Sequence, residues 1–475
     1  MKRFFLLMIL CAAVVHVHAK VTLPSVIGDN MVLQQQSDVA LWGMAKPDSK
    51  VIIAPSWTKK KTVVRSEIDG KWFVRVSTPQ AGGPYEIVFD DGDKTVIGNV
   101  LVGEVWICSG QSNMRMPMQG FDGQPVKGAS ELIVTARPSL QVRLCRVKES
   151  YAQQPAADCR AQWKENVPEA VSEFSAASYY FARLINQALD VPVGVIDVSW
   201  GGSMIESWME KELLEKEFPG EFDLSYFQTG ILPVKNANHS GGTAYNGMLA
   251  PIIPYTAKGF LWYQGCANVT RPDQYMRLQP AFVRMLREKW SNEDMPFYFA
   301  QIAPYGYSNK PEAQMAGIFM DAQARTLDLI PNSGMVTTHD VGEQYSIHPA
   351  HKQEVGHRFA FLALANQYGI KGIDAHAPLW KTVKYENGKA IMTFKVGRRG
   401  LSPNQKDIAG FELAGADKVF YPATARISKD GKTLTVRCPQ VPDPVAVRYG
   451  IHNYSEATVF NCAGIPLSPF RTDDW

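Results

Sequence analysis

The sequence predicts an α/β protein in which a helix-covered parallel sheet is flanked by β-rich regions at both ends of the chain. Three observations support this prediction. Short β-type segments separated by Gly, Pro and Asp turns fill residues 21–100. Apolar runs then alternate with helical stretches up to residue 374, a pattern typical of a parallel sheet buried on both faces. Short β-type segments return from residue 375.

These changes divide the chain into four parts. We expect a signal peptide, an N-terminal β-sandwich domain, a central α/β domain and a C-terminal β domain at residues 1–19, 20–100, 101–374 and 375–475. Hydrophobic residues make up 45 % and charged residues 20 %, as in ordinary globular proteins. A net charge of +3 provides no concentrated positive field, so we expect no nucleic-acid partner.

The N-terminus has the pattern of a secretory signal peptide. Lys2 and Arg3 precede an apolar run over residues 4–15, and the small-residue exit that follows predicts cleavage after Ala19. A membrane anchor is the alternative, but the run is shorter than the roughly 20 residues that span a bilayer. We therefore expect export to the periplasm or the medium and no membrane span.

The strands and helices of each part can be located in order. The N-terminal β segments are expected at residues 39–43, 50–54, 61–68, 71–78 and 85–89. The buried strands of the central domain are expected within 100–110, 191–202, 259–265, 296–302 and 333–342, and its helices at 174–189, 274–290, 312–329 and 352–368. C-terminal β segments are expected at 390–396, 407–413, 418–428, 434–438 and 445–450.

Ligands bind beyond the carboxyl ends of parallel strands, so the segments that follow the apolar runs are the places to look for chemistry. Ser112 lies in GQSNM directly after the first run, where its hydroxyl is a candidate nucleophile. A helix cap is an equally good interpretation of a serine at this position. The motif is not a GxSxG elbow, because Met114 takes the place of the second glycine.

Two further segments provide candidate donors for an oxyanion. Gly201 and Gly202 end the second run, where a backbone without side chains can approach developing negative charge. Asn268 lies in QGCAN after the third run, and Gln264 of the same segment carries a second amide. For each segment taken alone, a plain turn is the more common explanation.

His348 precedes the last helix of the central domain in an Ile-His-Pro sequence, where a neutral imidazole can act as general base. His339, His351 and His357 are near in sequence, so a metal site with Asp340 or Glu343 has to be weighed. The spacing matches neither HExxH nor another helix-based ligand pattern. We therefore expect no metal.

Six cysteines follow the predicted signal peptide, an even number in an oxidising compartment. Cys145 with Cys159 is the one pair close enough in sequence to consider as a bridge. A core of this size is stable without disulfide bonds, so we expect the cysteines to be buried free thiols.

The order Ser, Gly, Asn, His across successive strand ends resembles the SGNH hydrolases, and among them the sialate O-acetylesterase family. The resemblance covers nearly the whole chain after residue 19. It is carried by MVLQQ with VALWG, GEVWICSGQSNM, VPVGVIDVSWGGS, YNGMLAPIIPY with GFLWYQG, IHPAHKQEVGHR, GFELAGADKVFYPA and PFRTDDW. It implies an SGNH-hydrolase, flavodoxin-like parallel sheet as the core of the α/β domain.

The resemblance also implies a set of roles. Ser112 would be the nucleophile and His348 the general base of a carboxylic ester hydrolase that needs no metal or organic cofactor. Asn268, the Ser112 N–H and Gly201 or Gly202 would form the oxyanion hole. O-acetyl groups on sugars, most of all sialate acetylated at O9, would be the substrate.

The sequence departs from the family pattern at three positions. Tyr345 stands where an Asp usually precedes the catalytic histidine by three residues, so Asp340, Glu343 or a backbone carbonyl has to orient the imidazole. Cys266 replaces a Glu found in many members. Arg115 follows the nucleophile where an acidic residue is expected, so it is a candidate for binding an anionic substrate. A structural salt bridge is the other explanation for Arg115. Gln264 is a second candidate for substrate binding.

Two other functions remain compatible with these residues. One is an esterase for acetylated xylan or another plant glycan, because the chemistry at the ester carbonyl is the same. The other is a non-catalytic glycan-binding protein on a decayed hydrolase fold. The missing Asp and the replacement of Glu by Cys266 favour this alternative, and the intact Ser112, Asn268 and His348 argue against it. The sequence does not indicate an oligomeric state.

Overall fold

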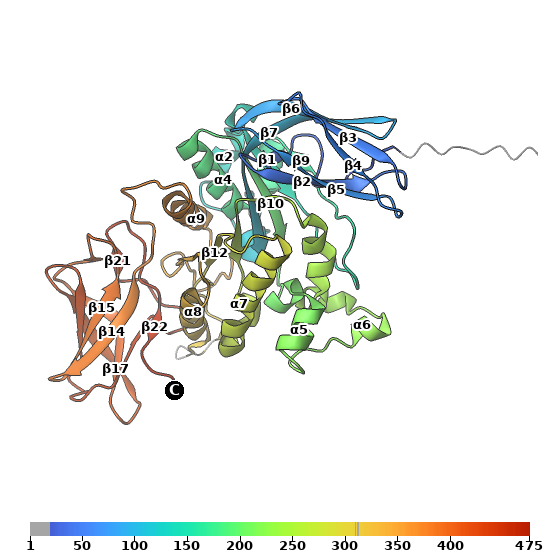
Figure 1. The fold of residues 1–475 in the computed structure, drawn as a ribbon. Helices are drawn as coiled ribbons and strands as arrows, with labels where there is room; N and C mark the ends of the chain where they lie inside the picture. Colours follow the sequence, from blue (N-terminus) through green and yellow to red (C-terminus); the bar gives the residue numbers. More distant parts are fainter. Residues whose placement is uncertain (1–19, 309, 311–312) are drawn as a thin grey trace, which may run out of the picture.

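The structure is a computed structural model that describes residues 20–308, 310 and 313–475. The predicted signal peptide lies outside these residues. The N-terminal and C-terminal β regions lie at opposite ends of a central α/β core (Figure 1). None of the described helices is both long and apolar enough to cross a bilayer.

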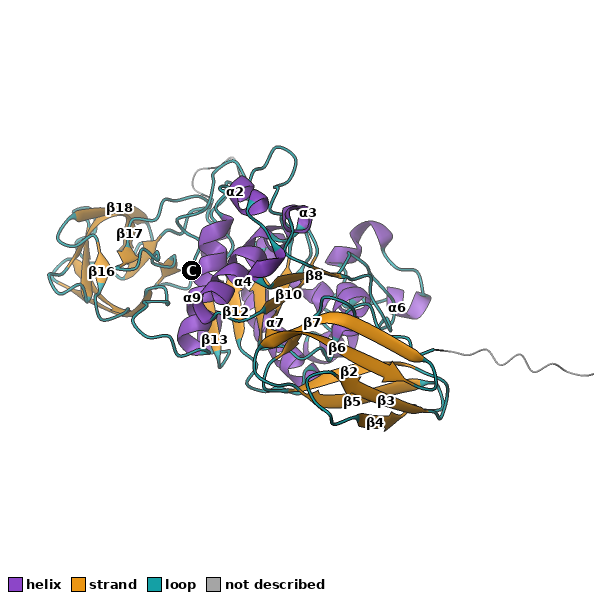
Figure 2. Ribbon diagram, turned by 90° about the horizontal axis from the view of Figure 1, so that it is seen from above, coloured by secondary structure: helices purple, strands orange, loops and turns teal. Residues whose placement is uncertain are grey.

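The N-terminal region consists of short strands in two layers. The strands β2 and β5 pair antiparallel as one sheet, and β4, β3, β6 and the first half of β7 form the other. Trp72 packs against Phe89 between the layers, with ring centroids 5.7 Å apart. Figure 2 shows these strands as a block without helices beside the core. The bounds are β1 Val32–Gln34, β2 Asp38–Met44, β3 Lys50–Pro55, β4 Thr62–Arg65, β5 Lys71–Ser77 and β6 Gly82–Asp90.

One strand, β7 (Lys94–Gly110), connects the N-terminal region to the core. Its first half pairs antiparallel with β6, and its second half pairs parallel with β10 and β11. The boundary predicted at residue 100 therefore falls inside a continuous strand. The N-terminal region and the core share a backbone ladder at this point, which fixes the direction in which β7 enters the core.

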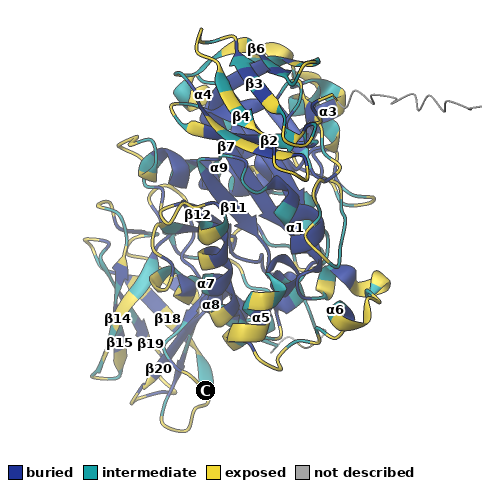
Figure 3. Ribbon diagram, turned by 45° about the vertical axis from the view of Figure 1, so that its right-hand side comes forward, coloured by how far each residue is buried: buried dark blue, intermediate teal, exposed yellow. Residues whose placement is uncertain are grey.

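The core contains a parallel sheet in the order β13-β12-β11-β7-β10-β8, with β9 added antiparallel at the edge. The strands β10-β7-β11-β12-β13 follow the order 2-1-3-4-5 in the chain, and β8 pairs parallel with β10 at the outer side. The strands are almost wholly buried (Figure 3). Their bounds are β8 Val142–Arg146, β9 Trp163–Lys164, β10 Val193–Ser199, β11 Gly259–Tyr263, β12 Phe297–Ala300 and β13 Ser333–Val336.

Helices cover both faces of this sheet. On one face α4 (Ala176–Leu189) packs against α9 (Lys352–Asn366), and on the other α7 (Pro272–Lys289) packs against α8 (Met315–Arg325). Alternate strand residues contribute to two separate apolar clusters, one under each helix pair. Five shorter helices lie in the connections: α1 Ser112–Arg115, α2 Ala129–Val134, α3 Pro168–Glu173, α5 Lys211–Glu217 and α6 Tyr226–Thr229.

The C-terminal region is a seven-stranded antiparallel sheet in the order β14-β15-β19-β18-β17-β20-β22. Gly317 of α8 allows close docking, because a Cβ there would lie 2.1 Å from the Ile451 carbonyl oxygen. Asn453 also accepts hydrogen bonds from the backbone N–H groups of Ala316 and Tyr305. The strands are β14 Leu379–Glu386, β15 Lys389–Lys395, β17 Asp407–Ala414, β18 Phe420–Ile427, β19 Thr433–Arg437, β20 Ala446–Tyr449 and β22 Phe470–Arg471, and β16 Leu401–Ser402 pairs with β21 Phe460–Asn461.

The predictions of a parallel-sheet α/β core and of a C-terminal β region are confirmed. The sequence analysis missed β8, because Arg143 and Arg146 interrupt its apolar pattern. Arg143 is nevertheless buried on the strand, where its guanidinium pairs with Glu165 at 3.1 Å. All six described cysteines, Cys145 and Cys159 among them, are free thiols.

Candidate active site

Ser112 begins α1 directly after β7, at the carboxyl edge of the parallel sheet. The strand can run beside β11 up to this point because Gly110 has no side chain. Its φ is +140°, and a Cβ there would lie 2.2 Å from the Tyr263 carbonyl oxygen. The loops after the two strands are also tied together, since Gln111 Oε1 accepts a hydrogen bond from the Gly265 N–H at 2.9 Å.

The predicted glycine turn after β10 lies against Ser112. A Cβ at Gly201 would be 3.9 Å from Ser112 Cβ. Asn238 holds the turn by donating from Nδ2 to the Gly201 carbonyl oxygen at 2.8 Å, and Gly202 has a left-handed φ of +71°. Among the described residues neither the N–H of Gly201 nor that of Gly202 donates a backbone hydrogen bond. Both N–H groups therefore remain available to a ligand oxygen.

Asn268 is fully buried and its amide is fixed on both sides. Oδ1 accepts from Gln264 Nε2 at 2.7 Å and from the Ile205 N–H at 3.2 Å. Nδ2 donates to Glu206 Oε2 at 2.9 Å, while the other oxygen of Glu206 pairs with Arg271 at 2.6 Å. Since an amide nitrogen carries two hydrogens, one donor of Asn268 remains after the bond to Glu206.

Gln264 differs from its expected role in substrate binding. The side chain is fully buried, and Nε2 donates to the Ser203 carbonyl oxygen at 3.0 Å as well as to Asn268. It therefore supports Asn268 and presents no group at the protein surface. The reason is the short turn after β11, which directs this first residue into the core.

His348 lies in the connection between β13 and α9, and a second set of bonds brings this connection to Ser112. Asn113 Nδ2 donates to the Ile347 carbonyl oxygen at 2.9 Å. Lys352 Nζ donates to Asn113 Oδ1 at 2.6 Å and to the Pro349 carbonyl oxygen at 2.9 Å. The neighbours of Ser112 and His348 are thus bonded directly to each other.

The imidazole of His348 contacts a loop that the sequence analysis did not include in the site. Its Nδ1 is 2.5 Å from Gln124 Oε1, and the ring of Phe121 packs edge-on with centroids 5.2 Å apart. Burial and, to a lesser extent, the charge of Lys352 lower the pKa of His348 to about 4. Within the described residues no hydrogen bond joins His348 to Ser112 Oγ; such bonds often tighten only when substrate binds.

The two carboxylates considered as orienting acids have other partners, which corrects that expectation. Both oxygens of Asp340 accept from Arg358, at 2.7 and 2.6 Å. Glu343 Oε1 accepts from the Ala350 N–H at 2.7 Å. Among the described residues Nδ1 of His348 is bonded to Gln124 and to neither carboxylate.

The other histidines near this connection are held separately. His339 Nε2 is bonded to Ser455 Oγ at 2.8 Å, His351 pairs with Glu354, and His357 packs against Tyr180. No group of three or more His, Cys, Asp or Glu side chains that could hold a metal ion occurs in the part of the chain that the structure describes.

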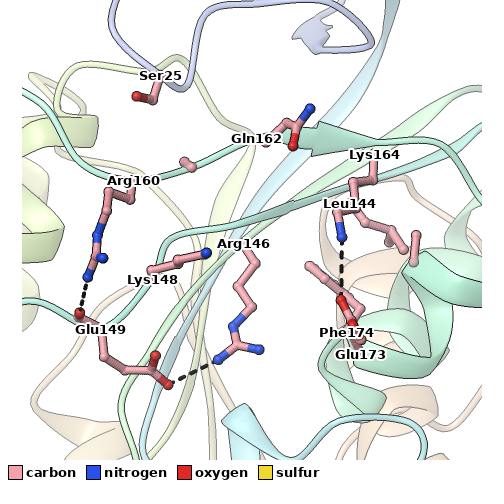
Figure 4. A pocket seen from close by; sticks show the side chains of 12 residues that line it. Ser25, Leu144, Arg146, Lys148, Glu149, Arg160, Gln162, Lys164, Glu173 and Phe174 are labelled. Carbon is pink, nitrogen blue, oxygen red and sulfur yellow. Dashed lines mark hydrogen bonds and ion pairs between the residues drawn. The ribbon is translucent and has the colours of Figure 1, made fainter.

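Arg115 forms a salt bridge, which the sequence analysis gave as the alternative to substrate binding. Its Nε is 2.7 Å from Glu149 Oε1, and its guanidinium lies 5.9 Å from the centroid of the Phe121 ring. Glu149 also binds Arg146 at 3.1 Å and reaches a cavity of about 700 Å³ (Figure 4). Four basic residues line this cavity: Arg146, Lys148, Arg160 and Lys164.

Comparison with known proteins identifies the family of the chain. The sequence model of the family described as carbohydrate esterase, sialic acid-specific acetylesterase, matches residues 102–365. The sialate O-acetylesterases of Homo sapiens and Pongo abelii are each 28 % identical to the chain over 430 residues, which cover 82 % of this chain and 79 % of theirs. The crystal structure of a carbohydrate acetylesterase from Xanthomonas citri superposes with a TM-score of 0.86 at 32 % identity, covering 96 % of this chain and 100 % of that one. The chain therefore belongs to the sialic acid-specific acetylesterase family of carbohydrate esterases.

Proposed function

We propose that this carboxylic ester hydrolase removes O-acetyl groups from sugars by a serine mechanism on an SGNH-hydrolase core, with Ser112 as nucleophile and His348 as general base. The hydrogen bond from Asn113 to Ile347 carries the proposal, because it joins the residue after the serine to the residue before the histidine at 2.9 Å. The order 2-1-3-4-5 of the strands β10-β7-β11-β12-β13 is that of flavodoxin-like sheets, which supports an SGNH-hydrolase core.

In the first half of the reaction, Ser112 Oγ attacks the acetyl carbonyl carbon while Nε2 of His348 takes the hydroxyl proton. The carbonyl oxygen becomes an oxyanion that accepts hydrogen bonds from Asn268 Nδ2, the Ser112 N–H and the glycine turn at 201–202. His348 then gives its proton to the sugar oxygen as the ester bond breaks. The sugar leaves with a free hydroxyl, and the acetyl group stays on Ser112.

In the second half, water takes the place of the sugar. His348 accepts a proton from the water as its oxygen attacks the acetyl carbon, and the same donors stabilise the second oxyanion. Collapse of this intermediate returns the proton to Ser112 Oγ and releases acetic acid, which ionises to acetate in solution. Every proton transfer uses Nε2 of His348, so the mechanism requires Nδ1 to stay bonded elsewhere.

Sialate acetylated at O9 is the first candidate substrate, because the family description and the vertebrate relatives both name sialate. A neutral acetylated glycan is the second. It is favoured by one observation: Glu149 already compensates Arg115, the cation next to the nucleophile that a sialate carboxylate would use. The Xanthomonas citri neighbour, described only as a carbohydrate acetylesterase, agrees with either.

The test is acetate release from 9-O-acetylated sialic acid, acetylated xylan and 4-nitrophenyl acetate, with the wild type, Ser112→Ala and the exposed control Ser130→Ala. We expect at least one sugar substrate to lose acetate with wild type and Ser130→Ala, and Ser112→Ala to be at background. Mass spectrometry of a Ser112 peptide should show an acetyl group after brief exposure to a slow substrate.

Either of two results would count against the proposal. Activity that survives Ser112→Ala would move the nucleophile elsewhere. No acetate release from any of the three substrates would favour the alternative of a glycan-binding protein without esterase activity. We also propose that residues 1–19 direct export, in which case secreted protein begins at Lys20 on N-terminal sequencing.

A further inference from the structure

We propose that Gln124 is the positioning residue of His348 and takes the place that a carboxylate has in Ser-His-Asp triads. This inference rests on the proposed function, because it assigns a role beside the proposed general base. Gln124 Oε1 lies 2.5 Å from Nδ1 of His348. An amide oxygen accepts but cannot donate, so Nδ1 carries the hydrogen and Nε2 keeps the lone pair that removes the Ser112 proton.

A tight turn holds Gln124 in place. The backbone N–H of Phe121 donates to the Gln124 carbonyl oxygen at 3.0 Å, and the N–H of Gln124 donates back to Phe121 at 2.9 Å. Asp122 and Gly123 form the tip, and Gly123 has a φ of +69°. The two backbone bonds fix the main chain of Gln124, so only its side-chain torsions have to be ordered when it binds the imidazole.

The same turn holds the ring from a second direction. Phe121 packs edge-on against His348, so the imidazole is fixed in rotation by the ring contact and in direction by the bond to Gln124. The loop carrying the turn is also bonded to the histidine connection, because the Lys127 N–H donates to the Ala350 carbonyl oxygen at 3.0 Å. These contacts are independent of the bonds that Asn113 and Lys352 make on the other side.

A neutral partner has an electrostatic consequence that a carboxylate would not have. The charged groups around His348 are Lys352 at the start of α9, Arg115 of α1 behind Phe121, and Glu343, which is bonded to Ala350. Burial, reinforced by Lys352, lowers the pKa of His348 to about 4. Gln124 adds no negative charge to oppose this shift, so the imidazole stays neutral, with Nε2 unprotonated, into mildly acidic solution.

The test is the pH dependence of kcat/KM for 4-nitrophenyl acetate with wild type, Gln124→Glu and Gln124→Met. Gln119→Glu and Gln119→Met are matched controls, because Gln119 is exposed in the same loop. We expect the acidic limb of the wild-type profile below pH 5. A carboxylate at position 124 should move this limb upward by about 1 to 3 pH units, and the Gln119 variants should not move it.

Gln124→Met keeps the length of the side chain but removes the acceptor. We expect kcat to fall by about 10- to 100-fold, with KM within about 2-fold and the acidic limb unmoved, because truncation adds no charge. ¹⁵N chemical shifts of the histidine rings should show Nδ1–H as the dominant His348 tautomer in wild type and a mixture in Gln124→Met.

Three results would overturn the proposal: wild-type kcat in a folded Gln124→Met, an unmoved acidic limb in Gln124→Glu, or an unchanged tautomer in Gln124→Met. The NMR measurement needs no turnover, so it decides the role of Gln124 even if the nucleophile is not Ser112. Activity that survives Ser112→Ala would instead contradict the proposed function. Failure of the two ideas is therefore distinguishable.

Discussion

The two sides of the candidate active site are held in place by different kinds of interaction. On the nucleophile side, Ser112, Gly201 and Asn268 each follow a strand of one parallel sheet, and backbone ladders fix the ends of those strands. On the base side, His348 lies in a long connection after β13 and is oriented by side chains from elsewhere in the chain. The first arrangement depends on the fold as a whole, and the second depends on a few individual contacts.

This difference predicts how each side responds to substitution. Removing a functional group on the nucleophile side should lower the reaction rate and leave the loops in place, because the backbone hydrogen bonds between the strands remain. Removing a contact on the base side should displace the imidazole. Five variants test this comparison and the charged groups around the site.

The largest effect is expected for Asn268→Ala, which removes a proposed oxyanion donor without disturbing a strand. We expect kcat/KM to fall by about 10²- to 10³-fold, or roughly 3 to 4 kcal/mol of transition-state stabilisation. KM should change little, whereas the melting temperature should fall, because Gln264, Ile205 and Glu206 lose a buried hydrogen-bond partner. Kinetics with 4-nitrophenyl acetate and thermal unfolding measure both.

Glu206→Gln is the companion variant, because Glu206 orients the Asn268 amide at 2.9 Å. It should lower kcat/KM by about 10-fold, because the Asn268 amide is still present but is displaced from the oxyanion. A loss below about 10-fold in Asn268→Ala itself would mean that the backbone N–H groups of the glycine turn and Ser112 carry the oxyanion without it.

The sequence was informative where chemistry follows the regular pattern of the sheet. Apolar runs located β7, β10 and β11, and the polar residues directly after them are the ones that lie together at its carboxyl edge. The partner of His348 could not be found in this way. Gln124 is 224 residues away in the chain, on a turn with no periodicity of its own. The nearby Asp340 and Glu343 were considered because they are close in sequence, yet Arg358 and the backbone bind them.

Glu206 escaped the sequence analysis for a related reason. It lies in a one-turn 3-10 helix, Ile205–Trp208, and nothing in its local sequence indicates that its carboxylate meets an amide from the loop after β11. Such contacts depend on how the loops cross the carboxyl edge of the sheet. Once the order of the strands is known, the loop after β10 is a place to search for a partner of Asn268.

On the base side, we expect Lys352→Met to lower kcat by about 10-fold, because Asn113 Oδ1 and the Pro349 carbonyl oxygen both lose their donor. The same variant should change how stability depends on pH. Burial lowers the pKa of Lys352 from 10.5 to about 7. Between these two values the unfolded chain binds more protons than the folded chain, so wild-type stability rises with pH.

Urea unfolding at pH 7 and pH 9.5 measures this rise, which we expect to be on the order of 2 kcal/mol in wild type and absent in Lys352→Met. Equal slopes in the two proteins would mean that Lys352 is charged at pH 9.5 in the folded state. Wild-type kcat in Lys352→Met would show that Gln124 and Phe121 orient His348 without help from this side.

A smaller effect is expected at Asp197, a fully buried carboxyl group on β10 that accepts from Ser199 Oγ at 2.5 Å. Burial raises its pKa from 3.8 to about 7, although Ser199 and Arg146 oppose the shift. The folded protein therefore binds more protons than the unfolded chain between these values, and stability falls as pH rises through that window. Asp197→Asn should stabilise the protein at pH 8 by about 1 to 2 kcal/mol.

The stabilisation should shrink steadily as the pH of the urea unfolding experiment is lowered from 8 to 4. Asp190→Asn is the control for replacing a carboxylate by an amide, because Asp190 is exposed at the end of α4. Destabilisation by Asp197→Asn at pH 8 would mean that the charged form is held by Arg146, contrary to the dominance of burial.

The smallest effect is expected for Arg115→Gln, which separates the two substrate classes. Arg115 is already paired with Glu149 at 2.7 Å, and a partly exposed pair of this kind contributes about 1 kcal/mol or less. We expect KM for acetylated xylan and for 9-O-acetylated sialic acid to change by less than about 3-fold. A KM that rises at least about 10-fold for sialate alone would mean that Arg115 leaves Glu149 to bind the sugar carboxylate. In that case the nucleophile side would contribute specificity as well as chemistry, and the basic cavity behind Glu149 would be the place to look for the rest of the sugar.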